Sequence, residues 1–263
     1  MRLVTSPIRL AKKAVLGTVL GDSYVGNRGG CRQKARIVLT QGAQQFQYLL
    51  WKMQLLYPFV GSYNIILGTS TSGRTIVHAQ SLGIHELYHV HKDLYAWKDN
   101  RWKKTVRLNV LRRLSPLSLA WWYQDDGHLD TKNGQIHKVS LATCGFPYAE
   151  QKLIQQYFAE AWKIQVEVYD HAGRYYCINM DKENGEKFIA LIAPFIHPIM
   201  RYKVDPSHKS AEREVTREEI VRTLQQCKDL VRNYQASSKK ALTLNWAEYV
   251  KGPKAMLALK LRA

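Results

Sequence analysis

Apolar residues recur at spacings of three and four in two well separated segments of the chain, which predicts two helices that each bury one face. The repeating apolar positions are Phe46, Leu49, Leu50, Met53 and Leu56 in the first segment and Leu153, Ile154, Tyr157, Phe158 and Trp162 in the second. A segment that favours strand structure comes before each helix, and a pair of such segments follows it. The same order of elements is therefore predicted twice.

The strand before the first helix alternates between apolar and polar residues, so its side chains point to opposite faces of a sheet. The apolar members are Ala35, Ile37 and Leu39. The polar members are Arg32, Lys34, Arg36 and Thr40. In the second half, the strand predicted over 138–143 repeats the pattern more weakly, with Lys138 and Ser140 turned outward. Each half is therefore expected to offer a polar strand face, and the first of these faces is strongly basic.

A glycine-arginine pair marks the turn of a predicted hairpin after each helix. Arg74 follows the glycine of the first pair, and Arg174 follows the glycine of the second, 100 residues later. The strand-forming runs around the two pairs are 65–67 and 76–77 in the first half and 166–169 and 175–178 in the second. Recurrence at one offset predicts an internal repeat and hence a two-lobed α/β protein.

The first repeat opens with the apolar segment 15–23, which is predicted to be a helix. Gly17 and Gly21 lie one turn apart in it. A glycine in a helix interior costs about 1 kcal/mol relative to alanine. Two glycines at this spacing indicate that a second helix packs closely against the first. The segment carries one acid, Asp22.

The second repeat opens with segment 115–127, which begins with the serine and proline typical of a helix start and ends at a glycine. The two residues before that glycine are Asp125 and Asp126. Asp126 lies 104 residues after Asp22, close to the offset of the two hairpins. The matching helices are therefore predicted to pack together and to bring these two carboxylates close to each other.

The charge of the chain points to a polyanionic partner. Its 263 residues include 39 Lys and Arg against 21 Asp and Glu, which gives a formal net charge of +18, while 46% of the residues are hydrophobic. That apolar content is typical of a folded protein, so the excess charge is expected on one surface, where nucleic acid is the natural ligand. No run of about 18 apolar residues predicts a membrane span. The four scattered cysteines, without a close pair, predict a reducing compartment and no compact zinc knuckle.

Segments 15–23 and 119–127 resemble the two motif copies of the monomeric LAGLIDADG homing endonucleases, with Ser23 and Trp121 as departures from the family pattern. Lys104 and Lys203, 99 residues apart, lie in stretches that also resemble the family. The resemblance implies an α/β (α+β) fold of two pseudo-symmetric αββαββα repeats, with central motif helices and two antiparallel sheets that form a saddle. The expected divisions are an N-terminal repeat over 10–94, a basic linker over 95–115, a C-terminal repeat over 116–208 and a basic helical extension over 209–263.

The resemblance also implies the chemistry of the site. Asp22 and Asp126 fall on the metal-binding position of the two motifs, and Mg²⁺ or Mn²⁺ is the expected ion. Gly21 and Asp125 fall on the preceding position and are secondary candidates for the metal. Lys104 and Lys203 would support catalysis in the two halves. Hard cations held by carboxylates provide most of what phosphodiester hydrolysis requires.

The expected ligand is a long double-stranded DNA site, cut in both strands by a single chain. The predicted DNA-binding residues are Arg32, Lys34, Arg36, Thr40, Arg74, Lys138, Ser140 and Arg174. Arginine is well suited to read guanine, whereas most contacts in such complexes go to phosphates. The protein is expected inside the cell, in a compartment that contains DNA.

Two other functions remain open at this point. Residues 85–89 form an H-E-x-x-H sequence, which on a helix can bind zinc in a metalloprotease, but no H-x-x-G-x-x-H extension follows it and exposed helix residues explain it better. Some proteins with the LAGLIDADG fold act instead as maturases that bind intron RNA and help the intron to splice. The paired acids and lysines favour the endonuclease.

Overall fold

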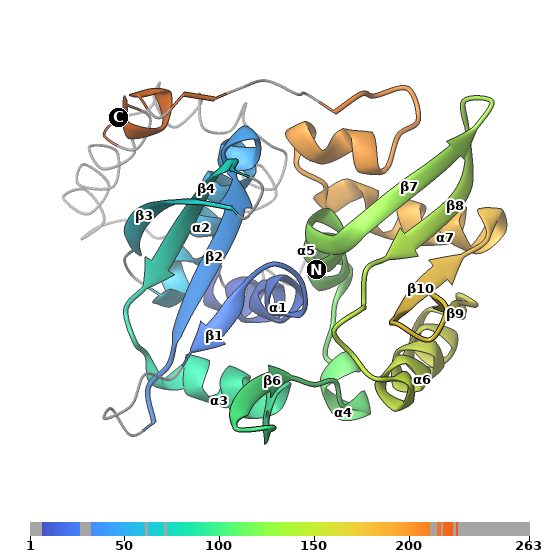
Figure 1. Cartoon of the computed structure of the whole chain (residues 1–263), viewed down its shortest axis with the longest axis horizontal. Coiled ribbons are helices and arrows are strands. Elements are labelled where there is room, and N and C mark those ends of the chain that lie inside the picture. Colours follow the sequence, from blue (N-terminus) through green and yellow to red (C-terminus); the bar gives the residue numbers. More distant parts are fainter. Residues whose placement is uncertain are drawn as a thin grey trace, which may run out of the picture.

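The computed structural model describes residues 7–26, 33–60, 63–70, 73–210, 215–216, 218–222 and 225. Two four-stranded antiparallel sheets flank a central pair of helices, α1 and α5, which are seen nearly end-on in Figure 1. Helix α2 lies behind the first sheet, and α6 and α7 lie behind the second (Figure 1). The predicted α/β (α+β) fold of two αββαββα repeats with central motif helices is confirmed.

The two halves contain the same elements in the same order. The first half consists of α1 (Pro7–Leu20), β1 (Tyr24–Gly26), β2 (Arg36–Gly42), α2 (Phe46–Val60), β3 (Tyr63–Thr69), β4 (Thr75–Ser81) and α3 (His85–Leu94). The second consists of α5 (Pro116–Asp126), β7 (Gly127–Lys132), β8 (Gln135–Leu141), α6 (Tyr148–Tyr157), β9 (Glu167–Asp170), β10 (Tyr176–Met180) and α7 (Lys182–Ile192). The strand orders, β1-β2-β4-β3 and β7-β8-β10-β9, match element by element.

Several predicted boundaries were wrong. Strand β2 begins at Arg36, so Lys34 precedes it, and Arg32 lies outside the described residues. The strand predicted over 138–143 begins three residues earlier and ends at Leu141. The short strands β1 and β7, which follow directly on the motif helices, belong to the αββαββα order implied by the family resemblance, but the residue pattern did not locate them. A strand of three residues such as β1 carries too little periodicity to be recognised.

The segment predicted as a basic linker contains regular structure. Strands β5 (Tyr95–Lys98) and β6 (Arg101–Lys104) form an antiparallel hairpin, and the short helix α4 (Leu108–Leu111) follows. Asp99 and Asn100 form the two-residue turn of the β5–β6 hairpin, with φ of 51° and 57°. Asp and Asn tolerate this left-handed conformation, which suits a tight hairpin. The connection between the two halves therefore has regular secondary structure.

Helices α1 and α5 touch through their backbones. A Cβ atom placed on Gly17 would lie 1.9 Å from the carbonyl oxygen of Ser118, and one placed on Gly21 would lie 2.6 Å from Cβ of Asp125. The hydroxyl of Ser118 donates to the carbonyl of Lys13 at 2.8 Å. The close approach expected from the two glycines is confirmed, and it brings the ends of the two helices together.

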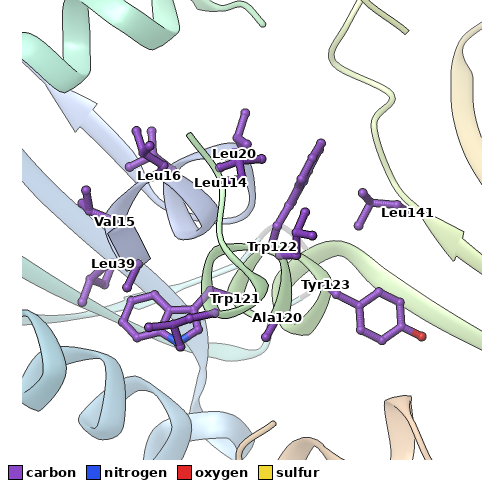
Figure 2. Close-up of a cluster of buried hydrophobic side chains, with 14 of the residues drawn as sticks. Val15, Leu16, Leu20, Leu39, Leu114, Ala120, Trp121, Trp122, Tyr123 and Leu141 are labelled. Carbon is purple, nitrogen blue, oxygen red and sulfur yellow. The ribbon is translucent and has the colours of Figure 1, made fainter. Parts of the chain in front are cut away.

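Large aromatic side chains of α5 fill the space around this crossing. Figure 2 shows Trp121 directed toward Val15 and Leu39 of the first half, with Tyr123 on the opposite side of the helix. The Trp121 ring lies 5.4 Å from that of Trp51, and both are buried. Trp121, which takes the place of the family's glycine, packs its ring against Trp51 of α2, and the close contact between α1 and α5 is made instead at Gly17 and Gly21.

The basic helical extension predicted over 209–263 lies largely outside the described residues. Ile220, which is among those described, is buried. Within the described part of the chain, no helix has the length and apolar character needed to cross a membrane.

We predict that Gly17→Ala destabilises the protein by about 1–3 kcal/mol or more, because the added methyl group overlaps the Ser118 backbone. Urea unfolding measures the change. Gly42→Ala is the matched control, because a Cβ there meets no atom within 4 Å and the residue has φ of −61°. Equal stability of the two variants would contradict the close crossing.

Candidate active site

The site is built where the central helices end. Asp126 is the last residue of α5, and Asp22 lies in the turn just after α1. Gln41, near the end of β2, donates to Oδ2 of Asp22 at 3.4 Å and to Oδ1 of Asp125 at 3.0 Å. Three carboxylates from the two halves thus gather at one point.

Two lysines approach this point in equivalent ways. Lys104, at the end of β6, donates from Nζ to the carbonyl of Gly21 at 2.5 Å. Lys203, in a short 3-10 segment (Pro198–Lys203), donates to the carbonyls of Gln124 at 2.7 Å and Asp125 at 3.2 Å. Lys104 therefore contacts the carbonyl of the residue before Asp22, and Lys203 contacts the carbonyl of the residue before Asp126. Asp22 and Asp126 are called the metal-position acids. The pairing of one lysine with each acid, expected from the sequence, matches this placement.

The two metal-position acids, Asp22 and Asp126, have raised pKa values. Burial raises the pKa of Asp22 to about 6, with a further rise from the charge of Asp125. Burial raises the pKa of Asp126 to about 7, with further rises from Asp22 and Asp125. Lys104 and Lys203 oppose both shifts. Solvent still reaches both residues, since Asp22 is exposed and Asp126 is half-buried. The lysines alone do not compensate these acids, and an added cation would favour their ionised form.

Asp125 has a different environment. Its Oδ1 accepts from Nζ of Lys52 at 2.5 Å, with both side chains fully buried, and from the hydroxyl of Tyr48 at 3.1 Å. Its Oδ2 accepts from the hydroxyl of Thr18 at 3.1 Å. Together with Gln41, all of these donors belong to the first half. The carboxylate of Asp125 is occupied by protein contacts and is not free to bind a metal.

Sequence reasoning missed Gln41, Tyr48 and Lys52. Gln41 continues the core-facing series of the β2 strand, where a polar residue at the end of an apolar run was the available signal. Tyr48 and Lys52 lie one turn apart on α2, next to the apolar positions that predicted this helix. A lysine on such a face usually extends toward water. Only the tertiary contact with α5 shows that this one is buried.

The predicted DNA-binding residues lie on strand faces and turns. Arg36 and Thr40 are half-buried on β2, where Thr40 forms a hydrogen bond with His78 at 2.9 Å. Ser140 is half-buried on β8. The exposed positions among them are Lys34, Arg74, Lys138 and Arg174. Val38, between Arg36 and Thr40 on the same side of the strand, is buried, so the polar face of β2 is interrupted.

The H-E-x-x-H sequence starts helix α3. His85, Glu86 and His89 are exposed, and the two imidazole rings lie 4.8 Å apart. Among the described residues, no cluster of three or more His, Cys, Asp or Glu side chains is arranged to hold a metal. These residues are exposed helix positions, and the geometry does not favour a zinc protease.

The pair of metal-position acids, Asp22 and Asp126, nevertheless fits a hard cation. Mg²⁺ keeps several waters and is held by one or two carboxylates together with phosphate oxygens, so three protein ligands are not required. Asp22 accepts one long hydrogen bond from Gln41. Neither Asp22 nor Asp126 forms a salt bridge within the described part of the chain. The oxygens required for such an ion are therefore present and largely uncommitted.

A family model described as the LAGLIDADG DNA endonuclease family matches residues 12–188 of the chain. The protein belongs to this family, as the two motif segments indicated.

Individual relatives are distant. The RecA protein of Mycolicibacterium flavescens is 26% identical over 217 residues, covering 78% of this chain and 49% of that protein, so the chain spans about half of its relative's length. The DNA endonuclease I-ChuI of Chlamydomonas applanata is 23% identical over 214 residues, covering 75% and 95% of the two chains. The cytochrome b mRNA maturase bI2 of Debaryomyces hansenii is 25% identical over 196 residues, covering 72% and 71%.

Among solved structures, the homing endonuclease I-WcaI bound to its DNA recognition sequence superposes with a TM-score of 0.64. The match covers 76% of this chain and 88% of that chain at 18% identity. At this identity, the likeness establishes a shared fold.

We predict that Lys52→Met destabilises the protein by about 3–5 kcal/mol, because it leaves the buried Asp125 carboxylate without its counter-charge. The double variant Lys52→Met with Asp125→Leu should recover much of this loss. Lys187→Met is the control, because its pair with Glu183 is exposed and contributes less than about 1 kcal/mol. Denaturant unfolding that gave similar losses for Lys52→Met and the control would refute the buried pair.

The raised pKa values predict how the metal-free protein responds to pH. Both carboxyls ionise near pKa 3.8 when unfolded, but at about 6 and about 7 when folded. Between these limits the folded state binds more protons, so stability falls as pH rises from about 4 to 7. Asp126→Asn removes one of these contributions. Its melting temperature in EDTA at pH 8 should therefore exceed that of the parent.

The exposed Glu186→Gln variant is the control for this experiment, with little change in melting temperature expected at pH 8. An Asp126→Asn protein that melts below its parent in EDTA at pH 8 would contradict the raised pKa, because it would show that nearby groups stabilise the ionised form of this carboxylate.

Proposed function

We propose that this protein is a site-specific double-strand DNA endonuclease that uses Mg²⁺ or Mn²⁺. The observation that carries the proposal is the pair Asp22 and Asp126, whose pKa values are raised because nearby positive charge does not balance their negative charge. The backbone carbonyl of the residue before each acid accepts a hydrogen bond from a lysine. Membership of the LAGLIDADG DNA endonuclease family supports this activity. Both acids come from one chain, so a monomer suffices.

Each residue has a role that follows from its position. Asp22 and Asp126 would hold the metal, with the main-chain carbonyls of Gly21 and Asp125 as further oxygens beside it. When bound, the divalent ion supplies charge neutralisation at the phosphate and a more acidic water. Lys104 and Lys203 would stabilise the charge that develops on the phosphate, since their positions are fixed in advance. Gln41 would hold the Asp22 carboxylate in place.

The proposed ligand is duplex DNA inside the cell. The exposed cations Lys34, Arg74, Lys138 and Arg174 favour the phosphate backbone, and Arg36, Thr40 and Ser140 on the strands offer polar groups to base edges. Arg32 was also predicted to bind DNA and lies outside the described residues. Strands that present such residues in a groove are a known means of DNA readout.

The similarity to the maturase bI2 favours a second candidate function, assistance of RNA splicing. A protein that acted only on RNA would not need metal-position acids. Splicing of the host intron by the Asp22→Asn variant, which should not cleave DNA, would separate the two activities.

We predict that Asp22→Asn and Asp126→Asn each lower cleavage by about 10²–10³-fold, since each removes part of the metal site, whose contribution is several kcal/mol. A randomised plasmid library incubated with Mg²⁺ or Mn²⁺, followed by sequencing of the ends, identifies the cut site and measures the rate. Duplex binding should persist. Glu186→Gln serves as the control, and undiminished cleavage by either asparagine variant would exclude that acid from the metal site.

A further inference from the structure

An open pocket of about 460 Å³ lies between the β5–β6 hairpin and the second half of the protein. Its walls come from the hairpin, the loop 144–147 after β8, the start of α6 and the turn before β10. Four cationic side chains line it: Lys98, Lys103, Lys104 and Arg174. Glu150 is the one carboxylate in its lining.

Glu150 is held by hydrogen bonds within the protein. Its Oε1 accepts from the hydroxyl of Thr105 at 2.8 Å, and its Oε2 accepts from the backbone N–H of Val106 at 2.9 Å. The half-exposed Lys98 approaches Oε1 only at 3.5 Å, and such an exposed pair contributes little and is readily exchanged for a phosphate. Glu150 therefore anchors the base of the hairpin to α6, and the pocket keeps an excess of positive charge.

The remaining cations are available to a ligand to different degrees. Lys103 pairs with Asp99 at the exposed hairpin turn, where an ion pair contributes little and is readily exchanged. The guanidinium of Arg174 forms no salt bridge with any residue that the structure describes. An exposed arginine without a partner, facing two lysines across a hollow, suits a ligand with several anionic groups.

The pocket is continuous with the acid pair. Lys104 lines it and also donates to the carbonyl of Gly21, next to Asp22. On the opposite wall, burial raises the pKa of the Cys144 thiol, and the charge of the nearby Asp126 adds a smaller rise. A strand whose phosphate lay at the acid pair would therefore have its neighbouring phosphates near this opening, because each strand of a duplex carries one phosphate per about 3.4 Å of axis.

We propose that this pocket binds the sugar-phosphate backbone of the DNA strand that leads away from the cleaved position. The inference rests on the proposed endonuclease function. Lys98, Lys103 and Arg174 would contact successive phosphates, and the partly exposed ring of Tyr175 would lie against a sugar. The hairpin that connects the two halves is then part of the DNA-binding surface rather than a passive linker.

The first test measures how DNA affinity depends on salt. Lys98→Gln with Arg174→Gln is compared with Lys163→Gln and Lys187→Gln, which removes two exposed charges, one just after the π-helical segment Phe158–Trp162 that follows α6 and one on α7. Binding of a labelled random-sequence duplex in EDTA is followed by fluorescence anisotropy. The pocket variant should bind about 10- to 100-fold more weakly. Its salt dependence should be shallower by about 1 for each lost phosphate contact.

The second test uses Cys144, which is exposed in the pocket wall, with the buried Cys177 as internal reference. Iodoacetamide labelling of the Cys144 peptide, quantified by mass spectrometry, should slow when duplex is added to the parent protein. It should slow much less in the pocket variant, whose melting temperature is checked against the parent.

The outcomes separate the pocket from the wider proposal. Unchanged Cys144 labelling, together with affinity and salt slope equal to those of the control variant, would overturn the pocket while leaving DNA binding intact. A parent protein that binds no duplex at any salt concentration would overturn both the pocket and the endonuclease.

Discussion

The buried charge on Asp125 constrains the rest of the structure. A carboxylate away from water must be compensated, because an unpaired buried charge costs several kcal/mol. Here the compensating groups are Lys52, Tyr48, Gln41 and Thr18, all from the opposite half of the molecule. Moving the halves apart would leave Asp125 without these donors and would leave Lys52 without its counter-charge. The ion pair therefore fixes how the two repeats meet, whatever its net contribution to stability.

The same arrangement leaves the metal-position acids, Asp22 and Asp126, without a direct ion pair among the described residues to balance their charge. Lys52 is committed to Asp125, while Lys104 and Lys203 donate to main-chain carbonyls rather than to the carboxylates. Burial and the charges of neighbouring carboxylates therefore outweigh the lysines and keep the pKa values of Asp22 and Asp126 raised. Functional sites commonly lower the stability of the folded state in this way. A bound divalent ion would relieve the repulsion, so that metal binding and folding would stabilise each other.

The sequence alone predicted those parts whose signals are local or repeated. The helices showed their periodicity, the hairpins carried a glycine-arginine pair in each half, and Gly17 and Gly21 marked the helix crossing. It did not predict the burial of Lys52, because a lysine between apolar positions is ordinarily solvated through its long stem. Nor did it predict the β5–β6 hairpin, because the abundance of basic residues over 95–115 indicated only a basic linker. In both cases, contacts between distant segments decide the outcome.

The two repeats depart from symmetry at the residue before each metal-position acid, and packing explains why. A Cβ on Gly21 would lie 2.6 Å from Cβ of Asp125, so the crossing has room for one side chain at these paired positions. Once one repeat carries Asp125, the other must carry glycine. A lysine contacts the backbone carbonyl on both sides, whereas only the aspartate side supplies a carboxylate that holds the halves together. An asymmetric pair at this position thus follows from helices that must touch, while the acids beyond it remain equivalent.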